Sequence, residues 1–420
     1  MTISASHKQP NRLSAAVIVP FAFFLVLALF FIFSKSIYLE RDLVLLAEGE
    51  LLAEEHMIPI GDTGLPSGMR VGVGLIYLTI KNILDLIAVF IVDNPTKAAL
   101  YPGLGWGFDD TFRPAYIQTT LVPLLSSVIW KLIALSALYV VAIRFYIGLI
   151  PRMVYLAIVM AAISGWPDII LNVFFSSMRR LADWPISYYL FTMETLPHDI
   201  AGIFFLNFLV IYLCRVSTVT VWHLVAITFS GQLIFEYLGF VTGVSVFFWS
   251  LWNEDGPANA RWRVAIKRLV LAGIISVIVA AGLVFTIYVE NDLVFSQYVA
   301  GVLTQSDKAG ASVGEDMWNF VDPKFTASVF FNVFALPIIF GVLFGSAISI
   351  FRNSLGQAAR ARGFRAATVV VIPFVLALII GLPVSGYLSD LGRQAVGGVT
   401  VVFAMVSFGT ELFFRRILHR

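Results

Sequence analysis

The chain has 420 residues, of which 59% are hydrophobic and only 13% are charged, and its mean hydropathy is +0.89. Soluble domains carry roughly 45–50% apolar and about 25% charged residues, so this composition excludes a soluble enzyme with one anchor, a disordered scaffold and a nucleic-acid binder. A disulfide framework is excluded too, because Cys214 is the only cysteine. The composition predicts an all-α, polytopic transmembrane bundle in which residues 1–420 form one integral membrane domain.

The first apolar run extends from Leu13 to Ser34 and is long enough to cross a bilayer, which needs roughly 20 apolar residues. No small-residue cleavage site follows it, so we expect an uncleaved helix with its N-terminus in the cytoplasm. Acidic residues outnumber basic ones in 35–70, a segment predicted to be an exterior loop that contains an amphipathic helix.

The apolar run 71–93 is interrupted by Lys81, Asn82 and Asp85. We predict that this segment is interfacial or re-entrant and does not cross the membrane. The alternative is that it does cross, in which case 218–252 becomes a single span.

The segment 94–119 is predicted to be an exterior loop rich in glycine, tryptophan and aspartate. Paired carboxylates beside aromatic rings suit a sugar or a divalent cation, which prefers oxygen ligands. We therefore predict Asp109 and Asp110 as catalytic base or metal ligands, with Trp106 and Arg113 as substrate-binding residues. The alternative is an ordinary aromatic belt at the membrane surface.

Further apolar runs bring the expected total to about ten spans (range nine to twelve); they lie at 120–143, 153–177, 199–215, 218–252, 269–289, 326–350, 366–387 and 394–414. The stretch 218–252 is too long for one span, so we expect two short helices, with Gln232 and Glu236 solvated at a hairpin tip near the outer surface.

Lys131 lies near the middle of the run 120–143, and Asp168 lies in the middle region of the next run. A cation at the bilayer centre costs about 2.5–3.5 kcal/mol on insertion scales unless it finds a partner or water. The two runs are joined by a short hairpin, which gives both residues the same depth in antiparallel neighbours. We predict a Lys131–Asp168 pair or a shared polar cavity. Its role is either to handle a substrate or proton, or only to fix helix register. The alternative is that Lys131 makes no such pair and snorkels toward the membrane surface.

The distribution of Lys and Arg assigns the sides of the membrane, because basic residues are retained in cytoplasmic loops. Basic residues gather in the loop 253–268, in the loop after 350 and after 414, whereas 290–325 is predominantly acidic. The first three segments are expected in the cytoplasm and 290–325 outside, which places both termini in the cytoplasm. Arg179 and Arg180 fall in the predicted exterior loop 178–198. They indicate either a phosphate-binding site or the opposite orientation of this half.

Three functions fit these features. The first is an enzyme of a bacterial inner membrane that acts on a lipid-linked substrate, a polyprenyl phosphate or a saccharide, at the exterior face. The second is a transporter or channel component that uses Lys131 and Asp168, and the third is a non-catalytic subunit of a membrane complex. No nucleotide-binding or zinc motif occurs. The cofactor is left open, with a divalent cation held by Asp109 and Asp110 as the candidate. The expected partners are the bilayer, the lipid-linked substrate and other membrane proteins, and not nucleic acid.

Overall fold

The computed structural model describes residues 12–32, 71–91, 121–163, 197–290, 334–350, 357–384 and 388–418. Within these ranges the chain forms eleven helices and no strand, which confirms the all-α class. The predicted exterior loops 35–70, 94–119, 178–198 and 290–325 lie outside the described residues, apart from residues at their edges.

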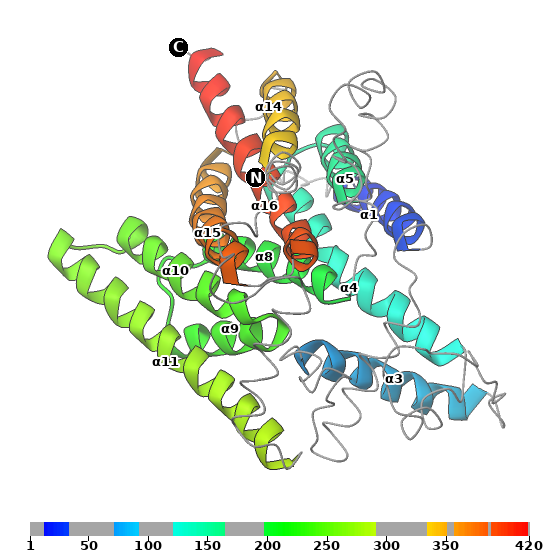
Figure 1. Ribbon diagram of the computed structural model, residues 1–420. Coiled ribbons are helices and arrows are strands. Elements are labelled where there is room, and N and C mark those ends of the chain that lie inside the picture. The colour runs from blue at the N-terminus through cyan, green and yellow to red at the C-terminus, as the bar shows by residue number, and fades with distance from the viewer. Residues whose placement is uncertain are drawn as a thin grey trace, which may run out of the picture.

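The helices are α1 (Arg12–Phe31), α3 (Val71–Ile91), α4 (Leu121–Phe145), α5 (Leu149–Ile163), α8 (Pro197–Arg215), α9 (Val221–Ile234), α10 (Glu236–Asn253), α11 (Ala258–Glu290), α14 (Leu336–Ser349), α15 (Gln357–Val384) and α16 (Leu388–Leu418) (Figure 1). Among the described residues, three helical segments are long and apolar enough to cross a membrane: Leu125–Phe145, Ala258–Leu283 and Gly397–Leu418. These segments are consistent with a membrane protein.

The stretch 218–252 divides as expected, because α9 ends at Ile234 and α10 begins at Glu236. Phe235 between them is extended, with φ −161° and ψ 136°, and α9 and α10 pack against each other. The prediction that Gln232 lies at a solvated tip is wrong, since only 6% of this residue is exposed. The helix α11 packs over this region, so the side chain of Gln232 is covered by protein.

Two predicted cytoplasmic loops are partly helical. The basic segment 253–268 is helical from Ala258, where α11 begins, and the basic segment after 350 is helical from Gln357, where α15 begins. Arginine and lysine are good helix formers, so both helices extend beyond their apolar runs into the basic segments.

The helix α16 lies at the centre of the bundle, where it packs against α14, α15, α8 and α5 (Figure 1). Its contact with α14 is close because Gly341 and Gly345, one turn apart, face it. A Cβ atom at Gly345 would lie only 2.6 Å from the carbonyl oxygen of Ser407. Small residues spaced four apart allow this kind of backbone approach between membrane helices.

Several helix termini meet at one end of the bundle. Arg152, in the first turn of α5, donates to the carbonyl oxygens of Ala16 in α1 (2.6 Å) and of Tyr146 just after α4 (2.8 Å). Near the end of α8, the thiol of Cys214 donates to the carbonyl of Ala359 in α15 (3.7 Å). The Nε of Arg360 in α15 joins these two groups, because it donates to the carbonyl of Phe145 at the end of α4. The starts of α1, α5 and α15 and the ends of α4 and α8 therefore share one end, which we call the arginine-rich end.

The hairpin of α9 and α10 opens toward the same end. His223, in the first turn of α9, packs edge-on against Tyr212 near the end of α8, with ring centroids 5.7 Å apart. The guanidinium of Arg365 in α15 lies 5.7 Å from the centre of the Trp252 ring at the end of α10. Phe235, at the far end of this pair, is therefore distant from the arginine-rich end.

The helix α11 runs along one edge of the bundle (Figure 1). Only 17% of the most apolar part of α11 is buried, compared with 56% of the corresponding part of α4 and 61% of that of α16. The outward face of α11 carries large apolar side chains, which recur every three or four residues from Trp262 to Val277: Trp262, Ile266, Val270, Ile274, Val277, Ile278 and Phe285. Such an apolar outward face is typical of a helix that borders lipid.

Candidate functional site

Of the predicted site residues, the structure describes Lys131. The predicted catalytic pair Asp109 and Asp110, the predicted binding residues Trp106 and Arg113, and the remaining predicted residues Asp168, Arg179 and Arg180 lie outside the described residues. The roles assigned to them stay predictions.

Lys131 is completely buried, with 0% of the residue exposed. It lies in the middle of α4, roughly 15 Å along the helix from Leu121 and about 21 Å from Phe145. Both distances are too long for a lysine side chain to carry its ammonium group to either end of the helix. The ammonium group is therefore held inside the bundle.

Polar and aromatic groups accompany Lys131 on α4. Ser127, one turn earlier on the same side of the helix, is buried, and so is Ser126. The adjacent Trp130 is also buried, with its ring centroid 6.0 Å from that of Tyr77 in α3. The indole N–H of Trp130 has no hydrogen-bond partner among the described residues. This part of the α3–α4 contact is thus rich in hydrogen-bonding groups within an otherwise apolar bundle.

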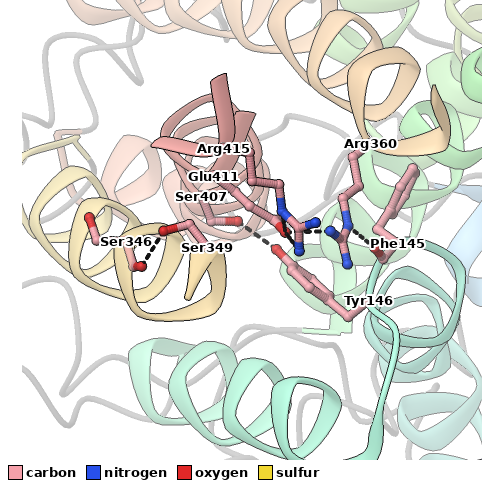
Figure 2. Close-up of polar contacts among 8 residues, drawn as sticks. All are labelled: Phe145, Tyr146, Ser346, Ser349, Arg360, Ser407, Glu411 and Arg415. Carbon is pink, nitrogen blue, oxygen red and sulfur yellow. Dashed lines mark hydrogen bonds and ion pairs between the residues drawn. The ribbon is translucent and has the colours of Figure 1, made fainter. Parts of the chain in front are cut away.

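A second polar site lies at the arginine-rich end, where Arg360, Glu411 and Arg415 form a buried charge cluster (Figure 2). Arg360 pairs through Nη1 with Glu411 Oε1 at 2.5 Å, and Arg415 pairs with the same oxygen through Nη2 at 3.0 Å. The exposed fractions are 1% for Arg360, 0% for Glu411 and 4% for Arg415. Two guanidinium groups therefore converge on one carboxylate in a region from which solvent is excluded.

The charge cluster joins three parts of the chain that are distant in sequence. Arg360 comes from the first turn of α15, Glu411 and Arg415 come from the last turns of α16, and the Nε of Arg360 donates to the carbonyl of Phe145 at the end of α4 (2.9 Å). That carbonyl lacks an intrahelical partner because it lies in the last turn of α4. Arg360 thus caps α4 while it pairs with α16. The second oxygen of Glu411, Oε2, has no hydrogen-bond partner among the described residues.

Tyr146 adds a neutral hydrogen bond beside the charge cluster (Figure 2). Its hydroxyl lies 2.6 Å from Ser407 Oγ, and the Ser407 hydroxyl donates to the carbonyl of Ala404 at 3.3 Å. Either hydroxyl can act as the donor in the bond between Tyr146 and Ser407. Burial raises the pKa of the Tyr146 phenol well above its ordinary value, so the group keeps its proton.

The change Tyr146→Phe removes this hydroxyl while it keeps the ring, which packs against Phe344 of α14 at a centroid distance of 5.4 Å. We expect the free energy of unfolding to fall by about 0.5–1.5 kcal/mol, the net value of one hydrogen bond, as measured by denaturant titration in detergent micelles. Tyr139→Phe is the matched control, because the hydroxyl of Tyr139 bonds to the carbonyl of Val17 at an exposed position. An equal loss in both variants would show that the buried hydrogen bond contributes no more to the free energy of unfolding than the exposed one.

Sequence reasoning missed the charge cluster because it assigned Arg360 and Arg415 to solvated cytoplasmic segments. One signal was present in the sequence. Glu411 is an acidic residue inside the apolar run 394–414, and it precedes Arg415 by four residues, which is the spacing of a helical ion pair. The pairing of Glu411 with Arg360, 51 positions away, has no such local signal.

Among the described residues, no group of three or more histidine, cysteine, aspartate or glutamate side chains is placed to hold a metal ion. The predicted divalent cation was assigned to Asp109 and Asp110, outside these residues, and stays a prediction. No protein family model, curated protein or solved structure matches this chain.

Proposed function

We propose that the chain is a ten-span integral membrane protein with both termini in the cytoplasm, and that the arginine-rich end faces the cytoplasm. The meeting of helix starts and ends at that end supports this topology, because it gives α1, α5 and α15 one direction and α4, α8 and α16 the other. The positive-inside rule supports the choice of side. The paired helices α9 and α10 start and end on the same side of the membrane. The side assigned to every other helix end is therefore the same whether or not α9 and α10 reach the outer surface.

The same topology bears on α3. If α1 leaves the cytoplasm and α4 returns to it, the intervening segment crosses the membrane an even number of times. The start of α3 lies against the end of α9, where Leu233 would be only 2.9 Å from a Cβ atom at Gly72. This contact lies away from the arginine-rich end and supports the proposal that 71–93 is interfacial or re-entrant.

We propose further that the protein is a membrane transporter or channel component in which Lys131 contributes to a polar site inside the bundle. The observation that carries this proposal is the complete burial of a lysine in the middle of a candidate membrane span. Ionisable residues at that depth characteristically mark a pathway for substrate or ions. Asp168 is the proposed partner, and a bacterial inner membrane is the proposed location. The competing prediction, an enzyme acting on a lipid-linked substrate, depends on the exterior segment 94–119.

A buried ion pair that only fixes helix register would bury Lys131 equally well, so the test must detect water access. Lys131→Cys, made together with Cys214→Ser to remove the native thiol, is treated with a charged, membrane-impermeant thiol reagent from each side of oriented membrane vesicles. A pathway predicts labelling of the introduced thiol from at least one side. Ala137→Cys is the matched control, since Ala137 is buried on the same helix. Absence of labelling from both sides at position 131 would disprove a water-lined pathway there.

A further inference from the structure

The break between α9 and α10 is bordered by buried oxygen atoms without hydrogen-bond partners. Thr228 and Gln232 are one turn apart on the same side of α9, with exposed fractions of 0% and 6%. Neither Thr228 Oγ1 nor Gln232 Oε1 has a partner among the described residues. A buried polar atom left without a partner costs about 1–3 kcal/mol. Two such atoms on one face of a short helix indicate a site that something else occupies.

The hydroxyl of Thr228 is oriented differently from those of comparable residues in this protein. Serine and threonine inside helices usually donate to the carbonyl four residues earlier, as Thr79, Thr242, Ser250, Ser346 and Thr368 do at 2.6–2.8 Å. Thr228 lacks this bond although its position in α9 permits it. Ser245 in α10 lacks a hydrogen-bond partner as well. The Thr228 hydroxyl therefore remains available to a ligand beside its own helix.

Gly239 leaves room for Gln232 Oε1 beside a side-chain oxygen of α11. A Cβ atom at Gly239 would overlap Gln232 Oε1 and would lie 2.7 Å from Ser276 Oγ of α11. Both oxygens therefore border the same small space beside the first turn of α10. Gln232 Oε1 forms no hydrogen bond with the Ser276 hydroxyl despite this proximity.

The backbone at the break favours positive charge at the end of α9. Because Phe235 is extended, the last carbonyls of α9 lose their partners in a continuing helix, and the C-terminal end of a helix carries a partial negative charge. The helix α9 has 14 residues and is about 21 Å long, less than the ~30 Å thickness of a bilayer core. In the topology proposed above α9 starts at the cytoplasmic side, so the break would lie inside the bilayer core, where water does not readily supply partners.

From these contacts we infer that Thr228, Gln232 and Ser276 form a binding site for a dehydrated monovalent cation, Na⁺ or K⁺, at the break between α9 and α10. Oxygen atoms are the ligands that hard cations prefer. The three side chains are neutral, so they can offset the desolvation of one charge but not of two, which favours a monovalent ion. The site lies on helices other than α4, and it would exist even if Lys131 had only a structural role.

The test is thermal unfolding of the purified, full-length protein in detergent micelles, in NaCl, KCl or choline chloride at constant ionic strength. A ligand that binds only the folded state raises Tm in proportion to the logarithm of its concentration. We expect Tm in NaCl or KCl to exceed that in choline chloride by about 2–4 °C or more and to keep rising with the logarithm of the cation concentration. Replacement of chloride by gluconate should leave Tm unchanged. A dependence on chloride, or a rise produced only by MgCl2 or CaCl2, would overturn the assignment.

Thr228→Val keeps the shape of the side chain and removes the oxygen, so the rise in Tm with Na⁺ or K⁺ should disappear in this variant. Gln232→Leu should behave in the same way. Thr242→Val is the matched control and should retain the rise, because the Thr242 hydroxyl already bonds to the carbonyl of Leu238 at 2.8 Å. Equal Tm values of the unaltered protein in all chloride salts, or a rise that persists in Thr228→Val, would refute the cation site.

Discussion

Replacement of Glu411 by alanine is expected to lower the free energy of unfolding by about 3–5 kcal/mol, the usual effect of removing one partner from a buried ion pair. The carboxylate is the common partner of Arg360 and Arg415, and all three residues are buried. Its loss removes the anion that both guanidinium groups face. Denaturant titration in detergent micelles, or the amount of folded protein recovered after extraction, measures this effect.

Glu254→Ala is the matched control for Glu411→Ala. Glu254 pairs with Arg268 beside the end of α10, where the side chains of Glu254 and Arg268 retain 14% and 15% exposure. Water can replace part of that interaction, so a loss of about 1 kcal/mol or less is expected. Glu411→Gln separates charge from shape, because it keeps an acceptor oxygen while it removes the charge, and its effect should lie between those of Glu411→Ala and Glu254→Ala. Equal losses for Glu411→Ala and Glu254→Ala would show that burial adds nothing to the charge cluster.

Gly345→Ala is expected to destabilise the contact between α14 and α16 by about 1–3 kcal/mol, the usual range for overpacking. The added Cβ atom would lie 2.6 Å from the Ser407 carbonyl oxygen and 2.9 Å from Thr410 Cβ. The oxygen belongs to the backbone and cannot rotate away, so the two helices must separate. Unfolding in detergent micelles should therefore begin at a lower denaturant concentration.

Gly273→Ala provides the opposite case within the same protein. Gly273 lies on α11, where a Cβ atom would have no neighbouring atom within 4 Å, and alanine is favoured over glycine in a helix by about 0.8–1.0 kcal/mol. We expect this variant to be as stable as the unaltered protein or slightly more stable. A similar loss in Gly345→Ala and Gly273→Ala would mean that close packing at α14 is not the cause.

The helical class and most helix positions could be predicted from the sequence. An apolar run of roughly 20 residues can satisfy its backbone hydrogen bonds in a bilayer by forming a helix. The run 120–143 corresponds to α4, and the division of 218–252 corresponds to α9 and α10. Helix ends were less predictable. The basic segments at the starts of α11 and α15 form helix although their composition resembles that of a loop. Lysine and arginine are common in solvated loops, but they are also good helix formers.

Pairings between distant residues were the least predictable feature. The burial of Lys131 agrees with its place in the middle of an apolar run. The contact of Arg360 with Glu411 and with the Phe145 carbonyl depends on how α4, α15 and α16 pack together, and no local pattern encodes that packing. The burial of Gln232 likewise depends on α11, which covers it.

The central position of α16 has a consequence for biosynthesis. Its packing partners α5, α8, α14 and α15 all precede it in the chain, so they are synthesised before their common neighbour exists. Arg360 in particular is translated before Glu411, and its ion pair can form only after the last turns of α16 have been made. The packing of these earlier helices is therefore completed late in synthesis.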